Sequence, residues 1–567
     1  MRSLTPSTAP VACPAPFNMA RYVLAAGQAT PDKIALHILR TSGAERWSYA
    51  RLSAAVRGVG TGLLAQGLSP GDRVLMRLGN SVDFPLTYLG AIAAGLIPVP
   101  TPATLTMPEV TSLAHGLQPA LIVAGDGIAL PQDDSIPTLR AADLVAMRDM
   151  PPCDWDMGAD GQGNPDRLAY IIYTSGTSGV ARAVMHAHRA VWARRMMWDG
   201  WYGLRPDDRL LHAGAFNWTY TLGTGLMDPW AIGATALIPS DTATLALMLR
   251  RFDATLFAAA PGVFRQMLRG ADALPLPHLR HALSAGEKLP DVTRDAWVAA
   301  TGRPVYEALG MSECSTFVSA APDRPVPPGA SGYAQPGRRI AVLGPDHAPL
   351  PHGQTGTLAI HRSDPGLFLG YRNAAEATAA CFAGDWFLTG DSVMLAQDGA
   401  VHYMGRDDDM MNAGGFRVSP IEVERVLNTH PAILECACAE VQVKPGTSVI
   451  AAFYVATDPG GRMADTPGGS ASCGPASSEP ASGGPAPFAP PGSPAAARPA
   501  PAPYAGQTPP ADPTTDPDDL ARFAAQNLAR YKQPRLFVPV TALPRGANNK
   551  LLRRVLRQEW EAAHGQA

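Results

Sequence analysis

The sequence predicts an α/β fold, with a large N-terminal domain of mainly parallel sheets and a small α+β C-terminal domain. From about residue 17 to residue 400, short apolar runs alternate with segments of helical period. After about residue 407 the chain changes to a compact helix-and-strand segment. A long stretch rich in Pro, Gly, Ala and Ser then precedes a last set of helical and strand-like residues.

The N-terminal alternation is clearest in a few segments. Residues 51–68 place Leu52, Val56, Val59 and Leu63 on one stripe of a helix, and residues 73–78 read as a short buried strand. Further strands are expected at residues 168–173, 254–260 and 281–286, each ending in a turn of small residues. Parallel strands need long crossovers, and the intervening helices supply them.

The C-terminal part begins with a well-marked helix. Ser419 can cap it, Pro420 suits its first position, and Glu422 closes a capping box. Disorder is predicted from about residue 457 to residue 516, because this composition cannot bury enough surface to offset its ordering entropy. Asp516 and Pro517 then start another helix. We therefore predict a flexible N-terminus (1–16), a large domain (17–407) and a C-terminal domain (408–567) that carries the insert.

Composition excludes several classes of protein. With 567 residues the chain exceeds a single typical domain, and a formal net charge of −3 offers no basic surface for nucleic acid or anionic lipid. We expect no nucleic-acid partner and no membrane association. The first residues lack the apolar core of a secretory signal, which predicts a cytoplasmic protein. The seven cysteines form no CxxC pair, and Cys436 and Cys438 are expected on one buried face of a strand.

A loop of glycines and hydroxyl residues follows the strand predicted at 168–173. Glycines let backbone N–H groups approach an anion, and hydroxyls add further donors. The loop is not a Walker A sequence, because Val180 stands where that motif has Lys. Taken alone, such a turn is compatible with a purely structural role. Its members are Thr174, Ser175, Gly176, Thr177, Ser178 and Gly179.

The string YTSGTSG at residues 173–179 resembles the phosphate loop of the adenylate-forming superfamily, which includes acyl-CoA synthetases, peptide-synthetase adenylation domains and luciferases. Further segments resemble this family in the same order. They are YEALGMSE (306–313), WFLTGD (386–391), YMGRDDDMMNAGGFRVSPIEVE (403–424) and LPRGANNKLLRR (543–554). The resemblance implies two α/β subdomains and a small β-barrel in the large domain, with a mobile C-terminal domain.

The resemblance also implies a role for individual residues. Lys550 would be the catalytic lysine, Glu313 the Mg²⁺ ligand, and Ser312 a contact to the α-phosphate. Asp391 and Arg406 would hold the ribose. Leu309 stands where an aromatic ring usually stacks on adenine, and SAGEKLP (284–290) resembles the matching segment of medium-chain or aromatic acid ligases. The remaining implied ATP-binding residues are Thr174, Ser175, Gly176, Thr177, Ser178, Gly179, Arg182, Gly286, Glu287 and Gly310.

A second group of residues is implied for the thiol and the acid. Asp408 would be the hinge, and Gly414, Gly415 and Arg417 would bind coenzyme A, with Gly415 beside the pantetheine channel. Trp218 and Tyr220 would line the acyl pocket, although aromatic residues are as often part of a core.

Some positions depart from the family pattern. Arg182, flanked by Ala181 and Ala183, replaces the usual Lys, and Asn549 replaces the Gly before the catalytic lysine. Arg keeps the charge but is larger and forked, so its phosphate contact does not simply follow. Asn tolerates a left-handed backbone better than other residues with a Cβ.

The predicted activity is an ATP-dependent carboxylate–CoA ligase, which forms an acyl-AMP and then an acyl-CoA from an aromatic or short- to medium-chain acid. Its cofactors would be ATP, Mg²⁺ and coenzyme A, and its partner a small carboxylic acid. A homodimer is compatible with the sequence. One alternative is loading of a carrier protein's phosphopantetheine, which the lack of a carrier domain after residue 567 disfavours. Another is an inactive nucleotide-binding relative.

Overall fold

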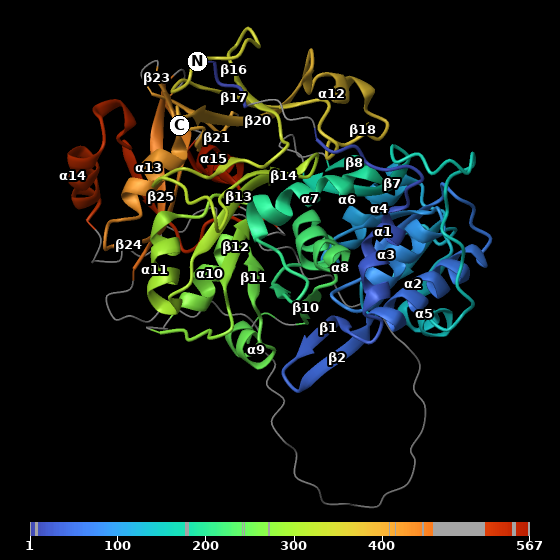
Figure 1. Ribbon diagram of the computed structural model, residues 1–567. Helices are drawn as coiled ribbons and strands as arrows, with labels where there is room; N and C mark the ends of the chain where they lie inside the picture. The colour runs from blue at the N-terminus through green and yellow to red at the C-terminus, as the bar shows by residue number, and fades with distance from the viewer. Residues whose placement is uncertain are drawn as a thin grey trace, which may run out of the picture. The chain divides into compact units, whose positions relative to one another are not determined.

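The computed structural model describes residues 2–5, 10–175, 181–240, 242, 244–269, 273–407, 409–413, 416–444, 447–457, 516–546 and 551–564. The chain divides into two compact units (Figure 1). The large unit comprises Met1–Met410 with Arg545–Leu551, and the small unit Met411–Pro544 with Leu552–Ala567. The division falls two residues after the predicted hinge, Asp408, which itself lies outside the described residues.

The largest sheet of the large unit has nine strands, in the order β15-β14-β13-β12-β11-β9-β10-β1-β2. Neighbours from β13 to β1 are parallel, and the strands at both ends are antiparallel. The strands predicted at 254–260 and 281–286 are confirmed as β11 and β12. The bounds are β1 Ile34–Arg40, β2 Gly43–Ser48, β9 Arg209–His212, β10 Thr235–Pro239, β11 Leu256–Ala259, β12 His281–Ala285, β13 Val305–Met311, β14 Ser315–Ser319 and β15 Tyr333–Ala334.

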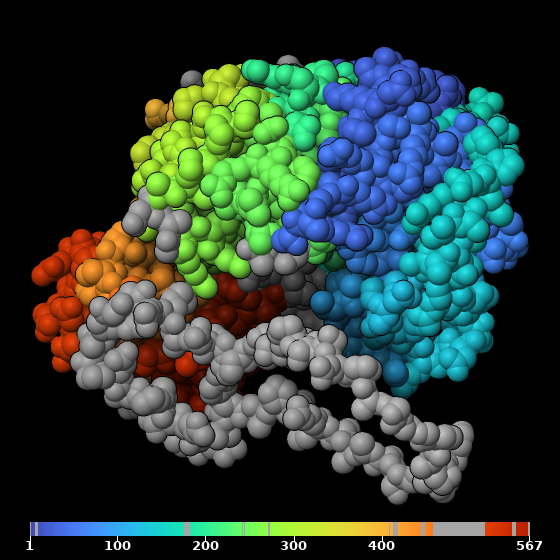
Figure 2. All heavy atoms as spheres, turned by 90° about the horizontal axis from the view of Figure 1, so that it is seen from below, coloured from blue at the N-terminus to red at the C-terminus, as the bar shows by residue number. Residues whose placement is uncertain are grey.

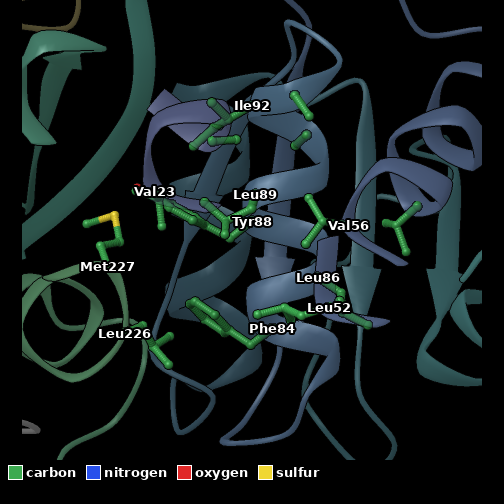
Figure 3. Close-up of a cluster of buried hydrophobic side chains, with 14 of the residues drawn as sticks. Val23, Leu52, Val56, Phe84, Leu86, Tyr88, Leu89, Ile92, Leu226 and Met227 are labelled. Atoms are coloured by element: carbon green, nitrogen blue, oxygen red, sulfur yellow. The ribbon is translucent and has the colours of Figure 1, made fainter. Parts of the chain in front are cut away.

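A second, fully parallel sheet has the order β4-β3-β5-β6. Its strands are β3 Arg73–Arg77, β4 Ile97–Pro100, β5 Leu121–Ala124 and β6 Thr138–Arg140. Two of its helices, α2 (Tyr49–Leu64) and α3 (Asp83–Ala93), pack on each other, as Figure 3 shows for Leu52, Val56 and Phe84. The predicted helical stripe is confirmed, since all four of its members are buried. Burying such a stripe against α3 is what stabilises α2.

The other helices of the large unit are short, and Figure 1 places many of them beside the two parallel sheets. Several begin with a recognisable cap; Asn18, for example, accepts the backbone N–H groups of Ala20 and Arg21 at the start of α1. Their bounds are α1 Met19–Ala25, α4 Met107–Leu117, α5 Ala141–Met147, α6 Arg189–Ala193, α7 Arg195–Met197, α8 Asp228–Ile232, α9 Leu245–Arg251, α10 Pro261–Leu268, α11 Asp291–Thr301 and α12 Ala375–Ala379.

Two antiparallel sheets complete the large unit. One has the order β18-β8-β7, with β7 Leu168–Ser175, β8 Ala181–Ala187 and β18 Gly370–Tyr371. The strand predicted at 168–173 is therefore confirmed as part of β7. The other is five-stranded, with β16 Ile340–Leu343, β17 Thr355–His361, β19 Phe382–Ala383, β20 Trp386–Leu395 and β21 Val401–Arg406.

The small unit has a three-stranded sheet, β24-β25-β26, and a hairpin of β22 and β23. Cys436 and Cys438 are both buried in its core, which confirms the predicted strand face. The sheet contains strands before residue 458 and a strand after residue 515, so the predicted disordered insert falls within the sequence of this unit. Residues 458–515 themselves lie outside the described residues. The bounds are β22 Met411–Ala413, β23 Phe416–Val418, α13 Pro420–Leu427, β24 Ile433–Lys444, β25 Thr447–Ala456, α14 Pro517–Asn527, β26 Leu536–Pro539 and α15 Arg553–His564.

Both predicted helix starts in the small unit are observed. Ser419 Oγ accepts the backbone N–H of Glu422 at 3.3 Å, and Asp516 Oδ1 accepts that of Asp518 at 3.0 Å. The Glu422 carboxylate also has a partner that the capping-box interpretation did not foresee, the Lys532 ammonium. Across the described residues of both units, no helix is long and apolar enough to cross a membrane.

Candidate active site

Two antiparallel strands lead into the predicted phosphate loop. β7 ends at Ser175 and β8 begins at Ala181, and the register pairs Thr174 with Arg182. Gly176, Thr177, Ser178 and Gly179 lie outside the described residues. The pairing nevertheless fixes Thr174 and Arg182 opposite each other where the two strands enter that segment.

Two hydrogen bonds to backbone carbonyls hold the segment that carries Ser312 and Glu313. His186 on β8 contacts the Ser312 carbonyl oxygen through Nε2 at 2.8 Å, and the Phe368 N–H donates to the Glu313 carbonyl at 2.8 Å. Burial lowers the pKa of His186 to about 4, so the neutral ring donates its Nε2–H to that carbonyl. The residues implied for phosphate and metal are thus tied to one another within the large unit.

The Glu313 side chain is buried and receives a hydrogen bond from Tyr371. The Tyr371 hydroxyl donates to Glu313 Oε1 at 2.8 Å. Burial, followed by the Glu313 charge, raises the pKa of Tyr371, which keeps the phenol protonated as a donor. The Arg182 guanidinium carbon lies 5.1 Å from the centre of the Tyr371 ring, within cation–π range. The arginine that replaces the family's lysine therefore stands next to the implied metal ligand.

Tyr371 is a site residue that the sequence did not indicate. It is separated from Glu313 by 58 positions, and nothing in the spacing of the two residues connects them. The connection arises because β18 pairs with β8, placing Tyr371 opposite Val184.

The two residues implied for the ribose, Asp391 and Arg406, are also brought together. They are opposite each other in β20 and β21, and Arg406 Nη1 donates to Asp391 Oδ1 at 3.2 Å. Arg406 also donates to the Thr389 carbonyl at 3.1 Å, and the Tyr403 hydroxyl lies 3.4 Å from Asp391 Oδ1. The Asp391 side chain is only 6% exposed, so its orientation is fixed by these partners.

Packing requires a glycine at position 310, in addition to the role in nucleotide binding that the resemblance implies. It sits in β13 next to Leu309, where the register with β14 shifts. A Cβ at Gly310 would lie 2.5 Å from the Ser315 carbonyl oxygen and 2.6 Å from Thr316 Cα, too close for any side chain. Leu309 is half-buried and packs against the core beneath the antiparallel sheet. Its aliphatic surface can cover a planar base, although without a π component.

Gly286 and Trp218 form the boundary of the implied acyl pocket. Gly286 follows β12 with φ +102°, and a Cβ there would lie 2.6 Å from Trp218 Cζ2. Trp218 is half-buried and meets Tyr220 edge-on, with ring centres 5.1 Å apart. Tyr220 is buried in the core, and its hydroxyl donates to the Leu283 carbonyl at 3.1 Å. Of the two aromatic residues, Trp218 is the one with an accessible surface to offer a substrate.

The turn after Gly286 is fixed by a buried carboxylate that the sequence did not reveal. Glu307 accepts Lys288 Nζ at 2.7 Å and the backbone N–H of Leu289 at 3.1 Å. Glu287, implied for ATP, lies 3.9 Å from Arg265. Glu307 thereby holds the segment that positions Gly286 and Glu287.

Several implied residues cannot be placed. Lys550, Asn549, Asp408, Gly414 and Gly415 lie outside the described residues. For Arg417 the structure gives the backbone, in β23 opposite Asn412. Within the described ranges no three His, Cys, Asp or Glu side chains gather in a way that would hold a metal ion by themselves.

The large unit thus contains the two strands that lead into the predicted phosphate loop, the buried Glu313 carboxylate, and the Asp391–Arg406 pair. Residues 24–372 match the family described as AMP-binding enzyme. The chain belongs to that family, as its motifs predicted.

Two named relatives and one solved structure match most of the chain. The chain is 31% identical to the benzoate–CoA ligase of Thauera aromatica over 437 residues, covering 73% of this chain and 78% of the relative. It is 30% identical to the human mitochondrial acyl-coenzyme A synthetase ACSM2A over 478 residues, covering 78% of this chain and 82% of the relative. The solved structure of the anthranilate CoA ligase AuaEII in complex with anthranoyl-AMP superposes with a TM-score of 0.79 at 22% identity, covering 96% of this chain and 98% of the solved chain. The predicted α/β fold of this superfamily is thereby confirmed.

Proposed function

We propose that this enzyme is an ATP-dependent carboxylate–CoA ligase, which activates an aromatic or medium-chain acid as its acyl-AMP and transfers the acyl group to coenzyme A. The observation that carries the proposal is the buried Glu313 carboxylate, hydrogen-bonded to Tyr371 and placed beside the strands of the phosphate loop. Relatives whose names specify benzoate or acyl-coenzyme A support the acid class and the thiol acceptor.

Adenylate formation joins two anions, so the task of the enzyme is to position them and to neutralise their charge. Arg182 brings a permanent cation to the base of the phosphate loop, opposite Thr174. Ser312, whose backbone is held by His186, would present its hydroxyl to the α-phosphate. These groups would orient the α-phosphorus toward the carboxylate and stabilise the charge that gathers on it.

Glu313 fits a magnesium ligand. Mg²⁺ is usually held by one or two carboxylates together with substrate phosphates, so a single buried Glu beside a phosphate loop suits it. Tyr371 occupies one carboxylate oxygen and fixes the orientation of the other. When bound there, Mg²⁺ would screen the phosphate charges.

Asp391 and Arg406 would hold the ribose. A carboxylate has about four acceptor sites, so Asp391 retains capacity for ribose hydroxyls while it accepts Arg406. The Arg406 guanidinium orients the carboxylate, and hydrogen bonds accepted by a charged group are stronger than those between neutral groups.

The acid would lie against Trp218. A half-buried indole that packs on the Cα of Gly286 gives a flat, rigid wall, and aromatic rings stack well on such a surface. We infer an aromatic acid, for example a benzoate, as the best substrate, with medium-chain acids next.

The catalytic lysine, the hinge and most of the residues implied for the thiol lie outside the described part of the chain. Lys550 would steady the carboxylate during adenylation, and rotation about Asp408 would then bring Gly414, Gly415 and Arg417 to the thiol. We also propose the domain limits 17–407 and 408–567 and a cytoplasmic location, on the sequence arguments given above.

One experiment separates the possibilities. Pyrophosphate, AMP and acyl-CoA are measured with a panel of aromatic, short-chain and medium-chain acids, with and without coenzyme A. The proposal expects pyrophosphate release with an aromatic acid and stoichiometric acyl-CoA and AMP when coenzyme A is present. Adenylate that coenzyme A does not consume would indicate a carrier-protein loader, and no pyrophosphate with any acid would indicate an inactive relative.

A further inference from the structure

A cationic cavity on the large unit is lined by none of the residues implied for ATP, acid or thiol. Its volume is about 420 Å³, within the range of small-molecule sites. It is formed by the β1–β2 hairpin, the start of β9 and the end of α9. Its lining residues are Ile34, His37, Gly43, Ala44, Arg46, Arg209, Arg251 and Phe252.

The position of this cavity in the nine-stranded sheet separates it from the candidate active site. Gly286 follows β12, and β1 is four strands away across β11, β9 and β10. At about 4.8 Å per strand, the separation is roughly 19 Å. Figure 2 shows the deep blue surface of the N-terminal residues meeting the green surface of the middle of the chain on one face of the large unit. A ligand could therefore occupy this cavity together with substrates.

Three guanidinium groups surround the cavity without a described counter-charge. Arg46, Arg209 and Arg251 form no ion pair with any carboxylate in the described part of the chain. The carboxylates adjacent to them in sequence are engaged with other groups. Glu45 accepts Trp47 Nε1 at 2.9 Å, Asp208 pairs with Arg280 at 2.6 Å, and Asp253 lies 3.3 Å from His278 Nε2.

Two of these guanidiniums are anchored while keeping donors for a ligand. Arg209 Nε donates to the Phe252 carbonyl at 2.7 Å, and Arg251 Nη1 donates to the Thr41 carbonyl at 2.9 Å. A guanidinium has five N–H donors, so Arg209 and Arg251 each keep several donors for a ligand. Arg46 lies directly opposite His37 in the β1–β2 register. The three charges thus converge on one space.

His37 adds a polar group that lacks a partner. Its residue is only 5% exposed, it lines the cavity, and its Nδ1 has no hydrogen-bond partner among the described residues. Burial, followed by the charges of Arg209 and Arg46, lowers the pKa of His37 to about 4, so its ring is neutral near pH 7. A buried polar atom without a partner is costly and is usually satisfied by water or a ligand.

The chemistry of the lining selects a class of ligand. Planar guanidiniums bind phosphate oxygens in a bidentate manner, and three of them balance an anion of two or more charges. Ile34, Ala44 and Phe252 give an apolar wall for an organic portion. We propose that this cavity binds a small organic phosphate carrying at least two negative charges, at a site distinct from the catalytic centre.

The test measures binding to the full chain by isothermal titration calorimetry at physiological ionic strength. The probes are 3-phosphoglycerate, inorganic phosphate and citrate, the last as a carboxylate-only polyanion. We expect 3-phosphoglycerate to bind more tightly than inorganic phosphate or citrate. In the double variant Arg46→Gln/Arg251→Gln the affinity should fall at least about tenfold, since two charged hydrogen-bond donors are lost.

A matched control uses Arg40→Gln. Arg40 is on the same hairpin, its side chain is 63% exposed and pairs with Glu45, and it does not line the cavity. This variant should keep the affinity of the wild type, and all variants should retain their melting temperature. The proposal is overturned if no phosphate probe binds, if citrate binds as tightly as 3-phosphoglycerate, or if Arg40→Gln weakens binding as much as the double variant.

Discussion

The Tyr371 hydroxyl donates a 2.8 Å hydrogen bond to Oε1 of Glu313, joining two residues 58 positions apart. Partners that orient a metal-binding carboxylate contribute substantially to metal affinity, although they do not touch the ion. In the proposed function Glu313 holds Mg²⁺, and Tyr371 is therefore a positioning residue. Tyr371→Phe removes the hydroxyl and leaves the ring on which Arg182 stacks.

For Tyr371→Phe we expect the Mg²⁺ concentration required for half-maximal pyrophosphate release to rise by about tenfold, with a smaller effect at saturating Mg²⁺. Binding of Mn²⁺ in the presence of ATP, followed by electron paramagnetic resonance, should weaken in parallel. Tyr403→Phe is the control, because it removes a hydroxyl 3.4 Å from Asp391 and leaves Glu313 untouched. If both variants change the metal dependence equally, Tyr371 has no positioning role.

The packing of Trp218 on Gly286 leads to a prediction about acid preference. Trp218→Leu keeps an apolar side chain but removes the flat wall. We expect kcat/KM for a benzoate to fall by about five- to tenfold relative to a medium-chain acid, since an aromatic pair contributes about 0.5–1.5 kcal/mol beyond its area. The ratio of the two kcat/KM values is the measurement, and an unchanged ratio would place the acid elsewhere.

Tyr220→Phe is the companion variant. It removes the 3.1 Å hydrogen bond to the Leu283 carbonyl in the core. The free energy of unfolding should fall by about 1 kcal/mol, because a buried acceptor loses its donor. The acid preference should not change, which separates a stabilising residue from one that contacts the substrate.

The order of the two half-reactions gives a prediction for the hinge. Asp408→Pro fixes φ at the implied pivot and should block the rotation that thiolysis needs. We expect ATP–pyrophosphate exchange to stay within about twofold of the wild type, while transfer to coenzyme A falls by on the order of 10²-fold or more. Equal loss in both half-reactions, measured separately, would show that Asp408 is not the pivot.

Local signals in the sequence were sufficient to predict many of the elements. Helical period identified α2, continuous apolar runs identified β7, β11 and β12, and cap residues located the starts of α13 and α14. These features depend on neighbours within a few residues, so one sequence contains the necessary information. The family motifs placed Asp391 and Arg406 in the same site, and the structure puts them 3.2 Å apart.

Tertiary partners could not be predicted in the same way. Tyr371 reaches Glu313 because β18 pairs with β8, Glu307 reaches Leu289 because β13 lies beside β12, and Lys532 reaches Glu422 from a distant turn. Each depends on strand order or domain packing, which residue spacing does not encode. The cationic cavity is a further example, since its arginines come from β2, β9 and α9 and are unremarkable when viewed singly.

Buried histidines predict acid sensitivity. His37, His186, His188, His212 and His281 all have a pKa of about 3 or 4, lowered chiefly by burial. The usual pKa of histidine is about 6.5, so near this pH the unfolded chain takes up protons that the folded chain does not. Folding stability therefore falls as the pH decreases below about 6.5. Between its pKa in the folded chain and its pKa in the unfolded chain, each histidine lowers the free energy of unfolding by up to about 1.4 kcal/mol for each pH unit of acidification.

His188 offers the sharpest test of this acid sensitivity. Its Nδ1 accepts the backbone N–H of Met19 at 3.0 Å, a bond that protonation would break. His188→Asn can keep an acceptor near that position without a group that titrates. We expect the variant to be somewhat less stable at pH 7.5 but to lose less of its melting temperature between pH 7.5 and pH 5 than the wild type does. The exposed His115, replaced by Asn, serves as the control, and its variant should follow the wild-type pH profile. If His188→Asn also follows that profile unchanged, protonation of the buried ring is not what opposes folding in acid.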